Sequence, residues 1–180
     1  MKRMVQTIRN ILICIILVII YLYWNGYYLS KEKCIEDSMR SLYVPDGEKI
    51  LEICNQGYCK TLVDHGDSFS LIGTKKQWTF YRVGNSATQC SLKNEHSFSH
   101  WTGYSRDFGS LTVVHRNNPK IEFIHIVLNS DETLVLNQWK DDYVVFLRQN
   151  VDDMDASGLY QAFDESGNLI EEICYFCEHN

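Results

Sequence analysis

An unbroken apolar run near the N-terminus most constrains what this chain can fold into. Fourteen consecutive apolar or aromatic residues extend from Ile11 to Trp24, and the run resumes after a two-residue break. A helix from Ile8 to Leu29 would be about 33 Å long at about 1.5 Å per residue, which is enough to cross a hydrocarbon core of about 30 Å. The run also lacks the polar stripe of a buried soluble helix. The sequence therefore predicts one transmembrane helix.

The charges that flank this run predict its orientation. Lys2, Arg3 and Arg9 are the only charged residues before Lys31. Because positively charged flanks tend to stay in the cytoplasm, we expect a cytoplasmic N-terminus and an extracytoplasmic C-terminal domain at the cell membrane. A cleaved signal peptide would require small residues at its cleavage site, and bulky aromatic residues follow the run instead. We therefore expect an uncleaved signal anchor over 1–29, a connecting helix over 30–44 and a β domain over 45–180.

The rest of the chain has the composition of a globular domain. The sequence is 45% hydrophobic and contains two prolines. Without the three basic residues of the N-terminus, 14 basic and 23 acidic side chains remain, which is a net charge of −9. Affinity for nucleic acid depends on neutralising phosphates, so we expect no nucleic-acid partner. The acidic balance equally argues against broad docking on anionic lipid.

The spacing of apolar residues changes from helical to alternating after residue 45. Ser30 can cap a helix, and Ile35, Met39 and Leu42 lie on one face of it before Pro45 ends it. Beyond it, alternation and turn signals predict strands over 48–54, 58–63, 68–72, 77–83, 110–115, 120–128, 133–139, 143–148, 159–163 and 169–174. We place turns at 55–57, 73–76, 140–142 and 164–168, and assign no structure to 84–109. The predicted fold class is mainly β, an antiparallel meander of hairpins preceded by a transmembrane helix and a short amphipathic helix.

Four segments carry a resemblance to a protein group. They are DSMRSLY at 37–43, EKI at 48–50, the strand that bears Trp78, and YQAFDESGNLI at 160–170. Together they resemble uncharacterised, membrane-anchored extracytoplasmic proteins of Gram-positive bacteria, over most of residues 30–172. The resemblance implies an N-terminal anchor, a small helix and a run of β-hairpins. It implies no activity and no functional residue.

Six cysteines outside the apolar run are candidates for disulfides: Cys34, Cys54, Cys59, Cys90, Cys174 and Cys177. An even number in an oxidising compartment allows up to three bridges. Cys54 and Cys59 flank a short hairpin loop and could face each other across it. The Cys174-x-x-Cys177 motif also fits a redox dithiol or half of a zinc site. A strand instead of a helix precedes it, and no well-spaced second pair accompanies it, so we favour structural bridges.

Two further motifs resemble metal sites. Asp153, Asp155, Ser157 and Gly158, with Asp164 in the twelfth position, match part of a calcium loop. The flanks read as strands where an EF-hand has helices, so an acidic hairpin connection is the preferred interpretation.

His96 and His100 have the spacing of two ligands one helical turn apart. The segment around them is not helix-like, so we interpret them as loop histidines. We therefore predict no metal site, no cofactor and no catalytic residue.

Five aromatic residues leave a choice between core and ligand face: Trp78, Tyr81, Trp101, Tyr104 and Trp139. Burial in the core is the commoner fate of such residues. The functional hypothesis is a single-pass membrane-anchored extracytoplasmic protein that binds a protein or surface ligand, or serves the envelope without chemistry. The alternatives are an envelope enzyme, hydrolytic or thiol-based, and an immunity or exclusion factor.

Overall fold

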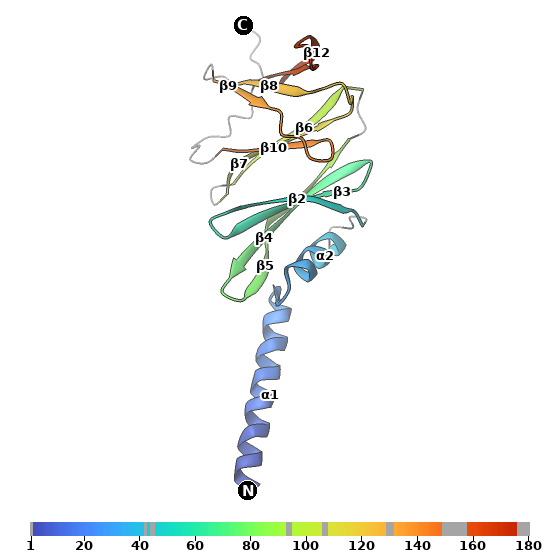
Figure 1. Ribbon diagram of the computed structural model, residues 1–180. Coiled ribbons are helices and arrows are strands. Elements are labelled where there is room, and N and C mark those ends of the chain that lie inside the picture. The colour runs from blue at the N-terminus through green and yellow to red at the C-terminus, as the bar shows by residue number, and fades with distance from the viewer. Residues whose placement is uncertain are drawn as a thin grey trace. The chain divides into compact units, whose positions relative to one another are not determined.

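The computed structural model describes residues 2–41, 43, 46–92, 95–105, 108–128, 132–148 and 158–175. Figure 1 shows the helices and strands of this part of the chain, and their antiparallel sheets confirm the mainly β class. In chain order they are α1 (Lys2–Trp24), β1 (Tyr27–Tyr28), α2 (Lys31–Ser41), β2 (Glu48–Asn55), β3 (Tyr58–Asp64), β4 (Ser68–Gln77), β5 (Phe80–Ser91), β6 (Phe98–Ser105), β7 (Gly109–Arg116), β8 (Phe123–Leu128), β9 (Thr133–Leu136), β10 (Tyr143–Arg148), β11 (Gly158–Phe163) and β12 (Leu169–Tyr175).

Helix α1 contains the apolar run. Within its segment Arg3–Trp24, a window of 18 residues has a mean hydropathy of 2.2, and no protein covers that window. Among the described residues this is the one helix long and apolar enough to cross a membrane. The helix ends at Trp24 and not at Leu29 as predicted, because Gly26 turns the backbone at a φ of 73° and Tyr27 enters a strand.

Helix α2 begins where the sequence predicts. The Ser30 hydroxyl accepts a hydrogen bond from the Lys33 backbone N–H at 3.2 Å, which is an N-cap. One face of the helix is buried and comprises Cys34, Ile35 and Ser38. At its start, Lys31 forms an ion pair with Glu52 of β2. The buried face and the ion pair with Glu52 therefore both hold α2 in place.

The first sheet has five strands in the order β1-β5-β4-β3-β2. The turn predicted at 73–76 is wrong, because β4 continues through these residues and the chain reverses at Trp78-Thr79. Gly73 is buried within the sheet. A β-carbon on Gly84 of β5 would lie 3.0 Å from the Gly73 carbonyl carbon. These glycines permit close approach of two strands, so Gly73 does not mark a turn.

Two further antiparallel sheets have the orders β10-β7-β6 and β12-β11-β8-β9. Strand β6 falls in the segment 84–109, to which the sequence assigned no structure. Phe98 and Val114 of the three-stranded sheet join Ile124, Ile126 and Tyr160 of the four-stranded sheet in one buried cluster. The two sheets therefore share a core.

The chain divides into two compact units. Unit 1 comprises Met1–Asp46, Glu52–Thr61 and Leu71–Thr88, and unit 2 comprises Gly47–Leu51, Leu62–Ser70 and Gln89–Asn180. The divisions fall within β2, β3, β4 and β5, so each of these strands contributes residues to both units. The single β domain over 45–180 stays a prediction.

Candidate functional site

A groove in unit 2 lies between strands β9 and β10. The two strands follow one another in the chain, but β9 is the last strand of the four-stranded sheet and β10 the last strand of the three-stranded sheet. The space between them has a volume of about 200 Å³. Its lining residues are Val135, Leu136, Asn137, Gln138, Val144, Val145 and Phe146.

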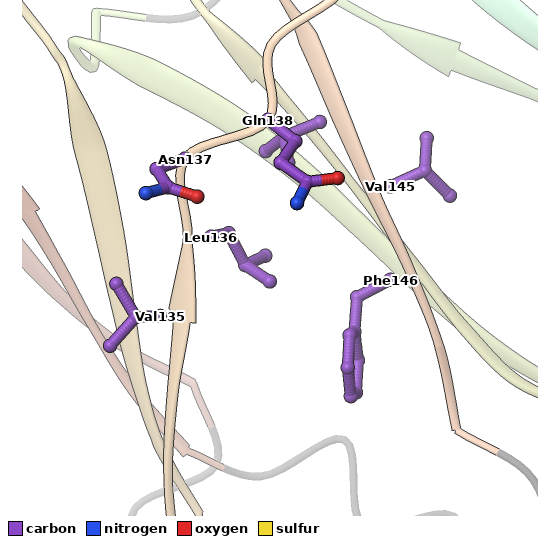
Figure 2. Close-up of a pocket in the computed structure, with 7 residues that line it drawn as sticks. Val135, Leu136, Asn137, Gln138, Val145 and Phe146 are labelled. Carbon is purple, nitrogen blue, oxygen red and sulfur yellow. The ribbon is translucent and has the colours of Figure 1, made fainter.

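The lining combines an apolar floor with polar side chains. Leu136 and Val144 are buried members of the shared core, and Phe146 packs against that core. Figure 2 shows Leu136, Gln138 and Phe146 directed into the space, whereas Val135 projects from the other side of β9. The groove therefore offers apolar contact area together with an amide that can donate and accept hydrogen bonds.

The groove also exposes sheet edges. Among the described strands, neither β9 nor β10 has a neighbour on its outer side. At the start of β10, Tyr143 and Lys140 exchange backbone hydrogen bonds of 2.9 and 2.7 Å. Beyond this bridge the outer edge of β10 offers backbone N–H and C=O groups to an added strand. Near the far end of β10, Arg148 pairs with Glu132 at 3.1 Å.

The cysteines give no reactive thiol pair in the described chain. Cys54 and Cys59 form a disulfide across the β2–β3 hairpin, with Cα atoms 4.0 Å apart. The loop between them has the two residues Gln56 and Gly57 at φ of 48° and 82°, as in a type I′ turn. Such a turn places the two cysteines opposite each other. Cys174 is also disulfide-bonded, and Cys177 lies outside the described residues.

Cys34 and Cys90 are free thiols, so the disulfides considered for them are not formed. Burial raises the pKa of Cys34 to about 11, and the nearby Asp37 carboxylate adds to the increase. Burial likewise raises the pKa of Cys90 to about 11. Because the thiolate is the nucleophile, both thiols are poorly reactive at neutral pH, which gives thiol catalysis no support.

The two histidines with metal-like spacing have separate protein partners. His96 pairs with Glu171 of β12 at 2.7 Å, and His100, which lies in strand β6 and not in a loop, packs against the Tyr160 ring at 4.5 Å. Burial lowers the pKa of His100 to about 4. Burial raises the pKa of Glu171, but hydrogen bonds from His96 and Ser97 outweigh it and lower the pKa. The His100 imidazole therefore serves packing, and the His96 imidazole a hydrogen bond to a carboxylate.

Of the calcium-like motif, the described part of the chain includes only Gly158 and Asp164. Asp153, Asp155 and Ser157 lie outside the described residues, and Gly158 begins β11. The Asp164 carboxylate accepts hydrogen bonds from the Asn168 amide and from the backbone N–H groups of Ser166 and Asn168. Asp164 thus organises the β11–β12 turn, as the hairpin interpretation expects.

Two other clusters resemble chemical sites at first sight. Glu52 lies near the sulfur atoms of Cys54 and Cys59, but those atoms are bonded to each other and Glu52 pairs with Lys31. His65 Nε2 lies 3.0 Å from the Ser70 hydroxyl. Ser70 is completely buried, so a substrate cannot reach it in this conformation. Neither cluster supports metal binding or hydrolysis.

The aromatic residues have different environments. Trp101 and Trp139 are half-buried, and the Trp139 Nε1–H donates to the Glu122 carbonyl oxygen at 2.6 Å. Between core and ligand face, the choice left open by the sequence, Trp78 and Tyr104 do not lie in the core, because they are 94% and 37% exposed. Trp78 lies at the tip of the β4–β5 hairpin.

Comparison of the chain with protein-family models, with curated proteins and with solved structures found no match. The groove between β9 and β10 is therefore interpreted from its own geometry. Sequence patterns did not single it out, because edge positions depend on which strands pair across the chain. The apolar residues on both sides of the predicted turn at 140–142 were the local signal.

Proposed function

We propose that this chain is a single-pass membrane protein that displays an extracytoplasmic β domain as a binding module for extended polypeptide segments. The observation that carries the binding proposal is the groove lined by β9 and β10, where two sheet edges flank an apolar floor. An extended segment can add to such an edge through backbone hydrogen bonds and place alternate side chains in the groove.

The membrane location rests on α1 and its flanking charges. The helix is apolar and uncovered by protein, and its basic residues precede the apolar run. The Cys54–Cys59 disulfide is compatible with an oxidising compartment. The likeness to extracytoplasmic proteins of Gram-positive bacteria stays part of this proposal. An envelope enzyme gains no support from the buried Ser70 or from the protonated thiols of Cys34 and Cys90.

Labelling of intact cells tests the orientation. The full chain is expressed with Cys90→Ala, because this half-buried free thiol could be labelled without reduction. The cells are treated with a membrane-impermeant maleimide before and after reduction, beside the same chain that also carries Cys54→Ser and Cys59→Ser. We expect labelling that appears on reduction and is diminished in the variant. Labelling without reduction would place the domain outside with a reduced hairpin. Labelling only after lysis would overturn the orientation.

Peptide binding tests the groove. A random linear peptide library is selected on the full chain in lipid nanodiscs, and the selected peptides are measured on two variants. Val135→Lys places a charge on β9, on the side where an added strand would direct the side chains that do not enter the groove. Leu169→Lys places a charge on β12, the opposite edge of the same sheet. These side chains are 55% and 52% exposed, so both variants should fold.

We expect the selected peptides to bind the wild type and Leu169→Lys alike, and Val135→Lys at least tenfold more weakly. Equal binding to both variants would exclude the β9 edge as the site. A comparable loss in both would point to a general effect of charge on the sheet.

A further inference from the structure

The tip of the β4–β5 hairpin carries a large side chain that the described fold does not explain. Trp78 is 94% exposed, and its backbone adopts a φ of 58°, in the left-handed region that disfavours residues with a β-carbon. A glycine would expose no large apolar side chain here, and it would adopt this φ without a steric cost. Exposed tryptophan in a strained position is a candidate for contact with something outside the protein.

This hairpin lies at the C-terminal end of helix α1. Strand β1 pairs with β5 in the register Tyr27 with Arg82 and Tyr28 with Tyr81, and only Asn25 and Gly26 separate β1 from the helix. A pocket of about 350 Å³ is lined by Leu22, Tyr27, Gln77, Trp78 and Phe80. One wall of this pocket is therefore the last turn of α1, and another is the hairpin tip.

Aromatic contacts extend from the end of α1 to the hairpin. The ring centroids of Tyr27 and Phe80 lie 6.4 Å apart, nearly perpendicular to each other. The Arg82 guanidinium lies 5.5 Å from the Tyr27 ring centroid. Aromatic and basic side chains of this kind are typical of the membrane–water interface, where one part of the side chain is apolar and another is hydrated.

The charge of the hairpin is opposite to that of the chain that contains it. Residues 75–82 read KKQWTFYR, with three basic residues and no acidic one. The chain after the N-terminal basic residues carries a net charge of −9. Anionic lipid attracts basic residues near its surface, so this hairpin is suited to a bilayer from which the acidic chain as a whole would be repelled.

We propose that the β4–β5 hairpin tip inserts Trp78 into the interfacial region of the same bilayer that α1 crosses, and forms a second contact with the membrane. The proposal rests on the membrane-spanning role of α1. Trp78 supplies the interfacial aromatic ring, while Lys76 and Arg82, both exposed, face the lipid headgroups. This second contact would restrict the orientation of the hairpin against the membrane surface, which a single helix followed by a short linker does not do.

Fluorine NMR of the full chain tests the proposal. The four tryptophans, Trp24, Trp78, Trp101 and Trp139, are replaced by 5-fluorotryptophan, and the protein is reconstituted in nanodiscs of phosphatidylcholine and phosphatidylglycerol. A small fraction of the lipid carries a nitroxide near the headgroup. Trp78→Phe and Trp24→Phe variants assign the two relevant signals, and at a 94% exposed position the first should fold normally.

We expect the nitroxide to broaden the Trp24 and Trp78 signals several-fold more than those of Trp101 and Trp139. Broadening of Trp24 without Trp78 would overturn the hairpin contact and leave the anchor intact, and the exposed ring would then be open to a protein partner. An unbroadened Trp24 would overturn the membrane-spanning role of α1, and the present proposal with it. Equal broadening of all four signals would also contradict a specific contact at the tip.

A second exposed aromatic residue provides a matched control. Tyr43 is 95% exposed and has a φ of 55°, which is close to the conformation of Trp78. In the same nanodiscs, Trp78→Ser should raise the amide hydrogen exchange rate of residues 77–80 several-fold, because the tip loses its contact with lipid. Tyr43→Ser should leave that rate unchanged. The proposal fails if both variants or neither variant change it.

Discussion

At the scale of single residues, Trp78 has a measurable effect on stability apart from any contact with lipid. A residue with a β-carbon in the left-handed region is disfavoured by about 1–2 kcal/mol, and glycine escapes this cost but loses more entropy on folding. We therefore expect Trp78→Gly to raise the free energy of unfolding by up to about 1 kcal/mol, as measured by urea unfolding of the full chain in detergent. Trp78→Ala keeps the β-carbon and should give no gain. An equal gain in both variants would contradict the argument.

His100 connects stability to pH. Burial lowers its pKa from 6.5 to about 4 in the folded protein. Between these values the unfolded chain binds more protons, so the stabilisation is complete above about pH 6.5 and falls as the pH drops toward 4, by at most roughly 1.4 kcal/mol per pH unit.

Unfolding measured between pH 4 and pH 7 should therefore be less dependent on pH in His100→Gln than in the wild type. His125→Gln removes another half-buried imidazole and controls for the loss of a ring. The assignment to His100 would be contradicted by parallel pH profiles of wild type and His100→Gln.

Residue patterns predicted some of these positions and misread others. Ser30 was identified as a helix cap, because a cap depends only on neighbours in the sequence. Gly73 was read as a turn residue, but it is a buried strand residue where β5 approaches β4 closely. That approach involves residues distant in sequence, so the local pattern around Gly73 could not reveal it. Because the turn was placed at 73–76, Trp78 was assigned to the strand after it and not to the turn at Trp78-Thr79.

At the scale of elements, the β2–β3 hairpin allows the contribution of one disulfide to the free energy of unfolding to be measured. In the loop-entropy model a disulfide that closes about six residues stabilises the fold by about 2 kcal/mol. We expect the Cys54→Ala/Cys59→Ala variant to unfold with a free energy lower by that amount under oxidising conditions. Cys34→Ala removes a buried thiol without removing a crosslink. Reduction also acts on Cys174, so the paired variant and not a reductant isolates this hairpin.

The helices and the first hairpin were largely predictable from the sequence, whereas the pairing of strands that are distant in sequence was not. The apolar run, the cap and the turn residues at Gln56-Gly57 mark α1, α2 and the first hairpin locally. The candidate groove depends on β10 pairing with β7, which lies before β8 and β9 in the chain. A simple meander would pair β10 with β9 and close the groove. Because this choice is made by long-range packing, the sequence did not predict the site.

At the scale of the whole molecule, the N-terminal charges should determine which side of the membrane receives the domain. Replacing Lys2, Arg3 and Arg9 with Gln removes the positive flank. We expect the fraction of chains with an externally labelled hairpin to fall from a large majority to a mixed population, as measured with impermeant maleimide after reduction. Lys33→Gln removes a charge from the opposite flank and should not reduce labelling. An unchanged fraction in the triple variant would show that another feature sets the topology.

The short pairing of β1 with β5 determines how the anchor transmits mechanical load. Among the described residues, two strand pairs, Tyr27 with Arg82 and Tyr28 with Tyr81, join the short segment 25–30 to the sheet. Tension between the membrane and the domain would act first on the pairing of β1 with β5. It would separate these two strands before it acts on the longer strands of the sheet. Once released, residues 25–30 would reach a fully extended length of roughly 20 Å, at about 3.4 Å per residue. The domain would then have a tether of adjustable length, short at rest and longer under force.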